Sequence, residues 1–384
     1  MNFDWIIVGA GFTGATFAER MAAAGKRVLV VERRTHIGGN AFDQHNEHNI
    51  LIHRYGPHIF HTNSDVVWNY LSNFTEWRPY EHHVLGLIQG HLVPVPFNLN
   101  SLTALFPGAL ARRIERHLVV EYGFGKKIPI LTLRESKHRE IKELAEYVYK
   151  HVFEQYTIKQ WGFLPEELSP SVTARVPIAV SRDDRYFQDR YQAMPLRGYT
   201  ALFSRMLQHP NIKLLLNCDW TDFGAELSGT RTLYTGAIDE FMGFRFGPLP
   251  YRSLRFDERT VNKDSFQPVG TVNYPNSNDF TRITEQKILT GQLSPITTIL
   301  TEYPTPHEPG RTIAYYPIPR EENQILYARY LEAARSEFPM VIFAGRLADY
   351  QYYNMDQACA RALKLASDNG GPNWTEKCGA QTIS

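Results

Sequence analysis

The spacing of apolar positions changes several times along the chain, and each change predicts a different kind of element. An apolar run at residues 6–8 is followed by a glycine-rich turn, an alanine-rich helical stretch and a second apolar run at residues 28–31. Two short apolar runs joined by one helix are typical of a βαβ unit in a parallel sheet. Residues 341–345 form a further buried-strand pattern, and a helix is expected from about residue 355 to 366.

The stretch from about residue 102 to 153 has the spacing of helices. Its clearest part follows the i, i+3, i+4, i+7, i+11 stripe of a single helix face. The apolar positions of this stripe are Ile141, Leu144, Ala145, Val148 and Val152. We therefore expect a helical insertion in which this face is buried.

Short β-branched and aromatic runs separated by turn residues fill two other parts of the chain. The first covers residues 84–93, where Gln89 and Gly90 are expected to form a hairpin turn, and the second covers residues 268–303. Hairpins join antiparallel strands, so the sequence predicts an antiparallel sheet from these segments.

The composition is that of a globular protein with room for two or three domains, since 43% of the 384 residues are hydrophobic. Lysine and arginine number 41 against 40 aspartate and glutamate residues, so we expect no nucleic-acid partner, which would require a broad basic surface. No apolar run approaches the roughly 18 residues of a membrane span, and no basic segment precedes the N-terminal run as in a signal peptide. No membrane association is expected.

The cysteines and histidines show no pattern of metal ligation. His53, His58 and His61 lie close together in sequence, but their spacing matches no zinc pattern, and no metal site is expected. The three cysteines are scattered and lack C-x-x-C spacing, so we expect reduced thiols and a cytoplasmic location. They are Cys218, Cys359 and Cys378.

The turn after the first apolar run carries Gly9, Gly11 and Gly14 in the spacing G-x-G-x-x-G. Such a turn lets the main chain approach a pyrophosphate at the positive end of the following helix. Glu32 ends the next apolar run, 21 residues after Gly11, where an acidic residue accepts hydrogen bonds from ribose hydroxyls. The alternative is a tight strand-to-helix turn that binds no ligand. That alternative does not explain why the glycine spacing, the two apolar runs and Glu32 occur together.

Arg34 is followed by Gly38 and Gly39 in the spacing R-x-x-x-G-G. This feature resembles the glutathione-reductase-like FAD proteins, and the resemblance favours FAD over NAD. Those proteins also have a C-terminal strand and helix that close over the cofactor. Residues 343–346 and the helix that begins near Met355 match this closing part, with main-chain N–H groups at the helix start facing the flavin.

The predicted fold is therefore α/β: an FAD-binding, Rossmann-like (glutathione-reductase-like) domain interrupted by a helical insertion and an antiparallel β-sheet domain. The expected limits are 1–75, 190–243 and 318–384 for the FAD-binding domain, 99–165 for the helical domain, and 76–98, 166–189 and 244–317 for the sheet domain.

Several further motifs occur in order between the glycine turn and about Ala366, and they are more specific together than any one alone. They are Arg54–His61, Tyr156–Gly162, Arg185–Phe187 with Met194 and Pro195, Tyr315–Pro317, and Gly345–Asp356. In these motifs the chain resembles the UDP-galactopyranose mutases, over nearly its whole length. The agreement is weakest in the helical insertion and the tail.

The resemblance implies a flavin-dependent, redox-neutral isomerisation of UDP-galactopyranose to UDP-galactofuranose. It implies that FAD must be reduced, and that flavin N5 displaces UDP to form a covalent N5–sugar adduct before the ring recloses. The partners would be these nucleotide sugars, an external reductant such as NAD(P)H or a flavin reductase, and a second copy of the chain in a homodimer. Whether the sugar carries a 2-hydroxyl or an N-acetyl group stays open, and Arg54 is a position of interest for that choice.

Arg175 and Arg282 match the family's pyrophosphate arginines, and a guanidinium suits this role because it binds phosphate oxygens bidentately and stays charged. With His61, which the resemblance places beside the flavin, they are the candidate catalytic residues. Residues 165–177 would form a mobile lid that carries Arg175. Alanine at either arginine is expected to lower catalysis and hardly to change folding.

The other substrate contacts that the resemblance implies are aromatic. Tyr156 and Trp161 match the uridine-binding stretch, where a ring can stack on the base, and three further tyrosines match hydrogen-bond donors to the diphosphate. The candidate substrate-binding residues are Tyr156, Trp161, Arg175, Tyr186, Arg282, Tyr316 and Tyr352.

The candidate cofactor residues come from the glycine turn, the flavin-proximal loop and the closing helix. They are Gly9, Gly11, Phe12, Thr13, Gly14, Glu32, Arg33, Gly38, Gly39, Asn40, His58, Ile59, Gly345, Arg346, Asn354, Met355 and Asp356. Asn354 stands where many family members have a carboxylate. Because an amide cannot take up a proton, we assign proton shuttling to the flavin and the substrate.

Other functions stay open at this point. An FAD-dependent oxidase or dehydrogenase of the amine-oxidase type would share the glycine motif, because the fold does not determine the chemistry. A catalytically idle flavin-binding protein would lack the diphosphate arginines and tyrosines, which are present. For single residues the plain alternatives are a surface ion pair for an arginine and core packing for an aromatic ring.

Overall fold

The computed structural model describes residues 3–169, 177–222, 230–276 and 278–374. One layer is a five-stranded sheet with strand order β12-β2-β1-β13-β19, in which every pairing is parallel. Its strands are β1 (Trp5–Val8), β2 (Val28–Glu32), β12 (Ile212–Leu216), β13 (Arg231–Tyr234) and β19 (Val341–Phe343). This Rossmann-like sheet confirms the predicted βαβ unit and the predicted C-terminal strand.

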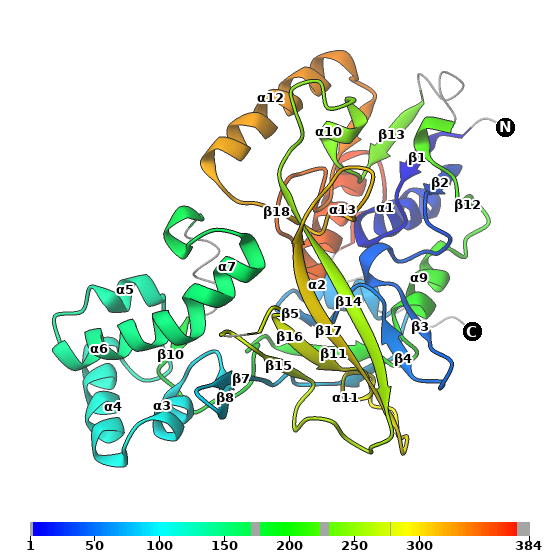
Figure 1. The fold of residues 1–384 in the computed structure, drawn as a ribbon. Helices are drawn as coiled ribbons and strands as arrows, with labels where there is room; N and C mark the ends of the chain where they lie inside the picture. Colours follow the sequence, from blue (N-terminus) through cyan, green and yellow to red (C-terminus); the bar gives the residue numbers. More distant parts are fainter. Residues whose placement is uncertain (1–2, 170–176, 223–229, 277, 375–384) are drawn as a thin grey trace.

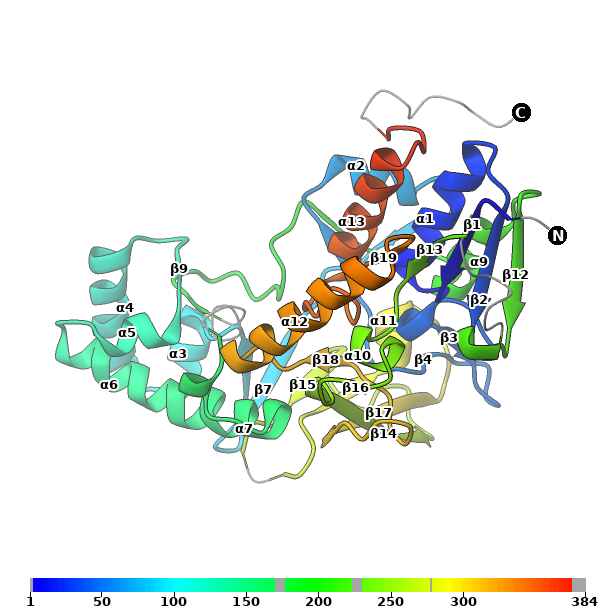
Figure 2. The ribbon, with the colours of Figure 1, turned by 90° about the horizontal axis from the view of Figure 1, so that it is seen from above.

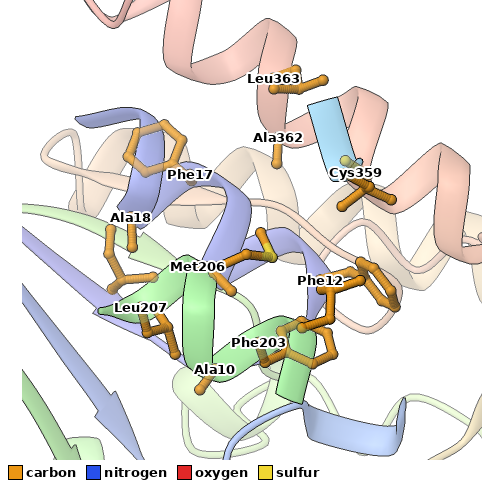
Figure 3. Close-up of a cluster of buried hydrophobic side chains, with 14 of the residues drawn as sticks. Ala10, Phe12, Phe17, Ala18, Phe203, Met206, Leu207, Cys359, Ala362 and Leu363 are labelled. Carbon is orange, nitrogen blue, oxygen red and sulfur yellow. The ribbon is translucent and has the colours of Figure 1, made fainter. Parts of the chain in front are cut away.

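Three helices pack together beside the parallel sheet: α1 (Phe12–Ala23), α9 (Tyr199–Leu207) and α13 (Met355–Asp368). The alanine-rich sequence of α1 lets α13 approach it closely. Figure 3 shows this core, where the rings of Phe12 and Phe203 meet edge to face with centroids 4.8 Å apart. Burial of these large rings holds the N-terminal end of α1 in place directly after the glycine turn.

The predicted helical insertion lies at one end of the molecule, and the parallel sheet lies at the other (Figures 1 and 2). The apolar stripe predicted from the sequence is buried throughout, which confirms that prediction. A π-helical segment, η2, continues α6 into α7 without a break. The elements are α3 (Leu99–Leu105), α4 (Gly108–Tyr122), α5 (Ile130–Arg134), α6 (Arg139–Val148), η2 (Tyr149–Glu154) and α7 (Gln155–Trp161).

A seven-stranded sheet with order β18-β14-β17-β16-β15-β7-β8 lies between these two regions (Figure 1). Gln89 (φ 48°) and Gly90 (φ 85°) join β7 to β8, so the predicted hairpin is confirmed. Its strands are β7 (Val84–Ile88), β8 (His91–Val95), β14 (Tyr251–Val261), β15 (Thr271–Asn273), β16 (Arg282–Glu285), β17 (Thr297–Pro306) and β18 (Tyr316–Pro317).

The expectation that this sheet is antiparallel throughout is wrong at one pairing, because β7 and β15 run parallel. No hairpin joins these two strands, which lie far apart in sequence, so turn geometry does not impose the antiparallel direction on them.

Three smaller sheets are also present. One of them pairs β10 with β9, although residues 166–189 were expected to belong to the sheet domain and β9 lies in the helical insertion. This pairing joins two predicted domains, and the predicted domain limits stay a prediction. The strands are β3 (Asp43–His45) with β4 (Leu51–His53), β5 (Phe60–Thr62) with β11 (Tyr191–Pro195) and β6 (Trp77–Pro79), and β9 (Lys127–Ile128) with β10 (Ile178–Ala179).

Six further helical elements belong to the described residues. They are η1 (Gly39–Ala41), α2 (Asp65–Leu71), η3 (Pro165–Glu167), α10 (Ile238–Phe241), α11 (Gln286–Thr290) and α12 (Glu321–Glu337). Within the described ranges, no helix combines the length and apolar character needed to span a bilayer.

Candidate active site

A cavity of about 710 Å³ lies where the glycine turn meets the N-terminus of α1. Only glycine fits at position 14, in the first turn of α1, because a Cβ there would lie 1.9 Å from the carbonyl oxygen of Gly9. A Cβ on Gly39 would lie 3.1 Å from the Cα of Gly11, so the glycine pair and the turn approach each other closely. With the open N–H groups of α1, this surface fits a pyrophosphate.

Glu32 ties the turn to the segment that follows β2. Its two carboxylate oxygens accept hydrogen bonds from the main-chain N–H groups of Ala10, at 2.9 Å, and Arg34, at 3.0 Å. Each oxygen has a second acceptor position, so the carboxylate can also bind ribose hydroxyls in the cavity that it lines. Arg33, at the same wall, forms an ion pair with Glu240 at 2.8 Å.

Arg34 is a cavity residue that sequence reasoning used as part of a motif but did not assign to the cofactor. Its Nη2 donates to Asn40 at 2.9 Å, and its guanidinium lies 4.5 Å from the centroid of the Tyr55 ring. Its Nη1 is buried, with no hydrogen-bond partner among the described residues. An unpaired buried donor of this kind costs free energy unless a ligand accepts from it, which fits an acceptor-rich dinucleotide.

A second cavity, of about 530 Å³, shares part of its wall with the first. It extends from this junction to the seven-stranded sheet and to α7. The residues that line both cavities are Asn40, His58, Tyr315, Arg346, Asn354 and Met355. A ligand of one cavity can therefore contact a ligand of the other.

Most of the predicted site residues line the two cavities. Ile59 and His61 lie at the second, and the Asp356 side chain, expected at the cofactor, lines neither, because its carboxylate accepts from the Thr62 hydroxyl at 3.0 Å. Arg175 is outside the described residues. The predicted substrate residues at the second cavity are Tyr156, Trp161, Tyr186, Arg282, Tyr316 and Tyr352. The predicted cofactor residues at the first are Gly9, Gly11, Phe12, Thr13, Gly14, Glu32, Arg33, Gly38, Gly39, Asn40, His58, Gly345, Arg346, Asn354 and Met355.

Arg282 has a buried partner that the sequence did not reveal. Its Nε and Nη2 donate to one carboxylate oxygen of Glu302, at 2.9 and 2.6 Å, from the neighbouring strand β17. The Glu302 side chain is only 2% exposed and also accepts from the Thr281 hydroxyl. Burial of Arg282 opposes its charge, but Glu302 outweighs this effect and raises the pKa of Arg282 above its usual range. Arg282 is therefore held charged at the cavity wall.

The register of the sheet places Asn273 directly opposite Arg282, on the side away from Glu302. Asn273 also lines the second cavity, although sequence reasoning did not select it. No local pattern marks this residue, because its place beside Arg282 depends on the pairing of β15 with β16.

Aromatic rings form one wall of the second cavity. Tyr316 and Tyr352 are stacked, with centroids 5.0 Å apart, and the Trp161 centroid lies 6.1 and 6.2 Å from theirs. Arg346 lies over both tyrosine rings and donates to the carbonyl oxygen of Tyr353. Burial raises the pKa of Tyr156 and Tyr316 above the usual range, so both are hydroxyl donors at neutral pH.

Histidines of two kinds line the second cavity. Burial lowers the pKa of His58 and of His82 to about 3, so both rings are neutral. His58 Nδ1 donates to the carbonyl oxygen of Gly56 at 2.9 Å, which leaves Nε2 as the acceptor of that ring. His61 instead contacts Asp189 through Nδ1 at 2.9 Å, and this hydrogen bond lowers the pKa of Asp189. Sequence reasoning missed His82 because its burial is a tertiary property.

We expect His82→Gln to weaken the acid sensitivity of the fold. Unfolded histidine titrates near its ordinary pKa of about 6.5, whereas folded His82 stays neutral down to about 3. Between these values the unfolded chain binds one more proton, so stability is present above pH 6.5 and is lost as the pH falls. Urea unfolding at several pH values gives the free energy of unfolding as a function of pH. Between pH 3 and 6.5 the slope of this free energy against pH should be smaller in the variant than in the wild type, by about 1.4 kcal/mol per pH unit.

The matched control is His91→Gln, because His91 is exposed on the edge strand β8. Its slope should equal that of the wild type. Equal slopes for wild type and His82→Gln would show that His82 takes up its proton at the same pH in the folded and the unfolded chain.

The family comparisons agree with this geometry. A family model described as an NAD(P)-binding Rossmann-like domain matches residues 7–74, and the model described as UDP-galactopyranose mutase matches residues 151–352. The chain belongs to the UDP-galactopyranose mutase family. This confirms the resemblance that the sequence motifs predicted.

Relatives of this mutase family member match it along almost their whole length. A probable UDP-galactopyranose mutase of Klebsiella pneumoniae is 35% identical, over 96% of this chain and 94% of that protein. A UDP-galactopyranose mutase of Mycoplasma genitalium is 34% identical, over 95% and 94%. A dTDP-fucopyranose mutase of Escherichia coli is 32% identical, over 94% and 97%.

Solved structures agree with the predicted fold of the mutase family. The crystal structure of a reduced UDP-galactopyranose mutase aligns with a TM-score of 0.71, at 16% identity, over 99% of this chain and 98% of that one. A putrescine oxidase bound to putrescine aligns with a TM-score of 0.58, at 12% identity, over 96% and 99%. At these identities the alignments show the fold alone, and the oxidase type predicted as an alternative is a distant structural relative.

Proposed function

We propose that this chain isomerises UDP-galactopyranose and UDP-galactofuranose, with FAD in its reduced form as the cofactor. The observation that carries the proposal is the shared wall of the two cavities, because it lets a flavin at His58, Arg346 and Met355 meet a nucleotide sugar bound along the sheet. The bound reduced flavin supplies an electron-rich N5 as the nucleophile for the anomeric carbon.

The chain's own part in this reaction is binding and orientation. Arg282, held charged by Glu302, neutralises the diphosphate that leaves the sugar, and Arg175 is proposed as its second partner. Tyr316 donates a hydrogen bond without adding charge. Tyr156 and Trp161 provide the faces on which the base stacks.

Asn354 lines both cavities. Its main-chain N–H donates to the Gln357 side chain at 2.9 Å, so Asn354 also caps the N-terminus of α13. Because its amide cannot take up a proton, the chain does not supply a general base at this position.

Turnover is expected only after reduction of the flavin, since an oxidised N5 is electron-poor and is not a nucleophile. Holoprotein would be incubated with UDP-galactofuranose, with and without dithionite, and the products separated by chromatography. UDP-galactopyranose should form only in the reduced sample. Equal turnover without reductant would contradict the mechanism.

Two further arms separate the alternatives. Anaerobic substrate added to oxidised protein should leave the yellow absorbance unchanged, whereas a substrate of an oxidase would bleach it. A dTDP-fucose substrate should be compared with the UDP sugar, because one relative at 32% identity is a dTDP-fucopyranose mutase. Preference for the dTDP sugar would replace the proposed substrate and keep the reaction type.

An external reductant, NAD(P)H or a flavin reductase, belongs to the same proposal. A redox-neutral reaction does not itself restore flavin that has been oxidised by air, so a separate electron donor is required. The homodimer and the cytoplasmic location stay predictions.

A further inference from the structure

Lys159 lies on α7, on the same helix as Tyr156, Gln160 and Trp161, which line the second cavity. Its side chain reaches away from that helix to the loop between β15 and β16. There its ammonium group, with three N–H donors, lies within hydrogen-bond distance of four main-chain carbonyl oxygens. The acceptors are the carbonyl oxygens of Tyr274, Asn276, Asn278 and Phe280, the last three at 3.2, 3.1 and 3.1 Å.

The ammonium group of Lys159 lies in a partly buried environment that disfavours its positive charge. Burial lowers the pKa of Lys159 to about 8, while Asp279 acts in the opposite direction. Carbonyl dipoles that point at the nitrogen compensate for the lost hydration. A neutral side chain of the same length would leave these oxygens without their shared donor.

Arg252 of β14 also holds the main chain of α7. Arg252 donates from Nε to the Gln160 carbonyl oxygen at 2.8 Å and from Nη2 to the Lys159 carbonyl oxygen at 3.0 Å. These oxygens belong to the last turn of α7, where helical carbonyls have no partner within the helix. Lys159 thus donates through its side chain to the β15–β16 loop and accepts through its carbonyl oxygen from Arg252 of β14. Two sets of hydrogen bonds therefore join α7 to the sheet.

The loop that Lys159 holds is part of the cavity wall. Asn273 and Pro275 at its start line the second cavity, and Arg282 follows its end. The N–H of Tyr274 donates to the carbonyl oxygen of Thr281 at 2.8 Å and closes the loop. The position of the ammonium therefore determines how far this wall stands from the α7 wall.

We propose that Lys159 is a positioning residue for the nucleotide part of the substrate. It holds the α7 wall and the β15–β16 wall of the cavity at the separation that a bound nucleotide requires, without touching the nucleotide itself. This inference rests on the proposed function, because it assumes that a nucleotide sugar occupies the second cavity.

The test compares Lys159→Met, which keeps the length and removes the charge, with the wild-type holoprotein. UDP binding is measured by calorimetry without turnover, and KM and kcat are measured in the reduced state. The Kd for UDP and KM should both rise roughly 10- to 100-fold, the range expected for loss of charged hydrogen bonds. The value of kcat should change less than about threefold, since the interaction is the same in the ground and transition states. Flavin content should not change.

Chemical rescue separates positioning from a general structural role. In Lys159→Ala, added methylammonium should restore UDP affinity, because it can place N–H donors among the four carbonyl oxygens. Tetramethylammonium at the same ionic strength has no N–H donor and should not. Lys150→Met is the matched control, since Lys150 is exposed on the preceding π-helical segment, and it should behave as wild type.

Wild-type UDP affinity in Lys159→Met would overturn the proposal. So would a fall in kcat with KM unchanged, or a parallel loss of flavin and melting temperature that methylammonium does not reverse. If the wild-type protein binds UDP but does not interconvert the two sugar nucleotides, the proposed function is wrong, while the affinity comparison still tests Lys159. If it binds no UDP, both are wrong.

Discussion

Replacing Arg282 with alanine is expected to lower kcat/KM of the reduced protein roughly 30- to 1,000-fold. Loss of one partner from a desolvated charge pair costs roughly 2 to 4 kcal/mol of transition-state binding, and each 1.36 kcal/mol is about tenfold in rate. Arg282→Lys should recover only part of this loss, because an ammonium keeps the charge but not the bidentate fork. The measurement is steady-state kinetics with dithionite-reduced holoprotein.

The structure corrects the expectation that folding would hardly change in this variant. Glu302 is almost completely buried, so Arg282→Ala leaves a carboxylate without its charged partner. Breaking a buried pair in this way costs roughly 3 to 5 kcal/mol of stability. The double variant Arg282→Ala/Glu302→Gln removes both charges and should recover most of the melting temperature but none of the activity. Recovery of activity would show that only the fold, and not the diphosphate, depends on Arg282.

Arg175 is the second arginine that is predicted to bind the diphosphate. It lies outside the described residues, and its role stays a prediction. If it also binds the diphosphate from a lid, Arg175→Ala should lower kcat/KM while flavin content and melting temperature stay at wild-type values. Near wild-type kinetics for both alanine variants would place the diphosphate elsewhere.

Replacing Gly14 with alanine is expected to give a purified protein that holds almost no FAD. The new Cβ would lie 1.9 Å from the carbonyl oxygen of Gly9 and 3.1 Å from its carbonyl carbon, so main chain must move. That movement displaces the N-terminus of α1 from the turn, and the pyrophosphate site depends on their contact. Flavin content is measured from the visible absorbance of the oxidised flavin, as a ratio to protein.

Gly108→Ala is the matched control for this substitution. Gly108 begins α4 in the helical insertion, and the nearest atom to its added Cβ is the end of the flexible Arg112 side chain, at 3.4 Å. This variant should bind FAD as the wild type does and be equally or slightly more stable. Full FAD content in Gly14→Ala would mean that the cavity at the turn is not the cofactor site.

The sequence alone determined the features that depend only on residues close to one another in the sequence. Gly9, Gly11 and Gly14 were recognisable because the spacing of the three glycines is a local motif. The apolar stripe near Ile141 and the turn at Gln89 and Gly90 were recognisable because helix and hairpin periodicity is local as well. The order of several such motifs was sufficient to predict the family.

Tertiary structure decided which of these residues meet and what holds them. Glu302 lies 20 residues from Arg282, and Lys159 lies 115 residues from Tyr274, so neither pairing leaves a periodic signal in the sequence. The parallel pairing of β7 with β15 and the burial of His82 likewise depend on packing between distant segments. Local pattern specifies elements, whereas the charge and shape of the cavity arise from the contacts that form when those elements pack.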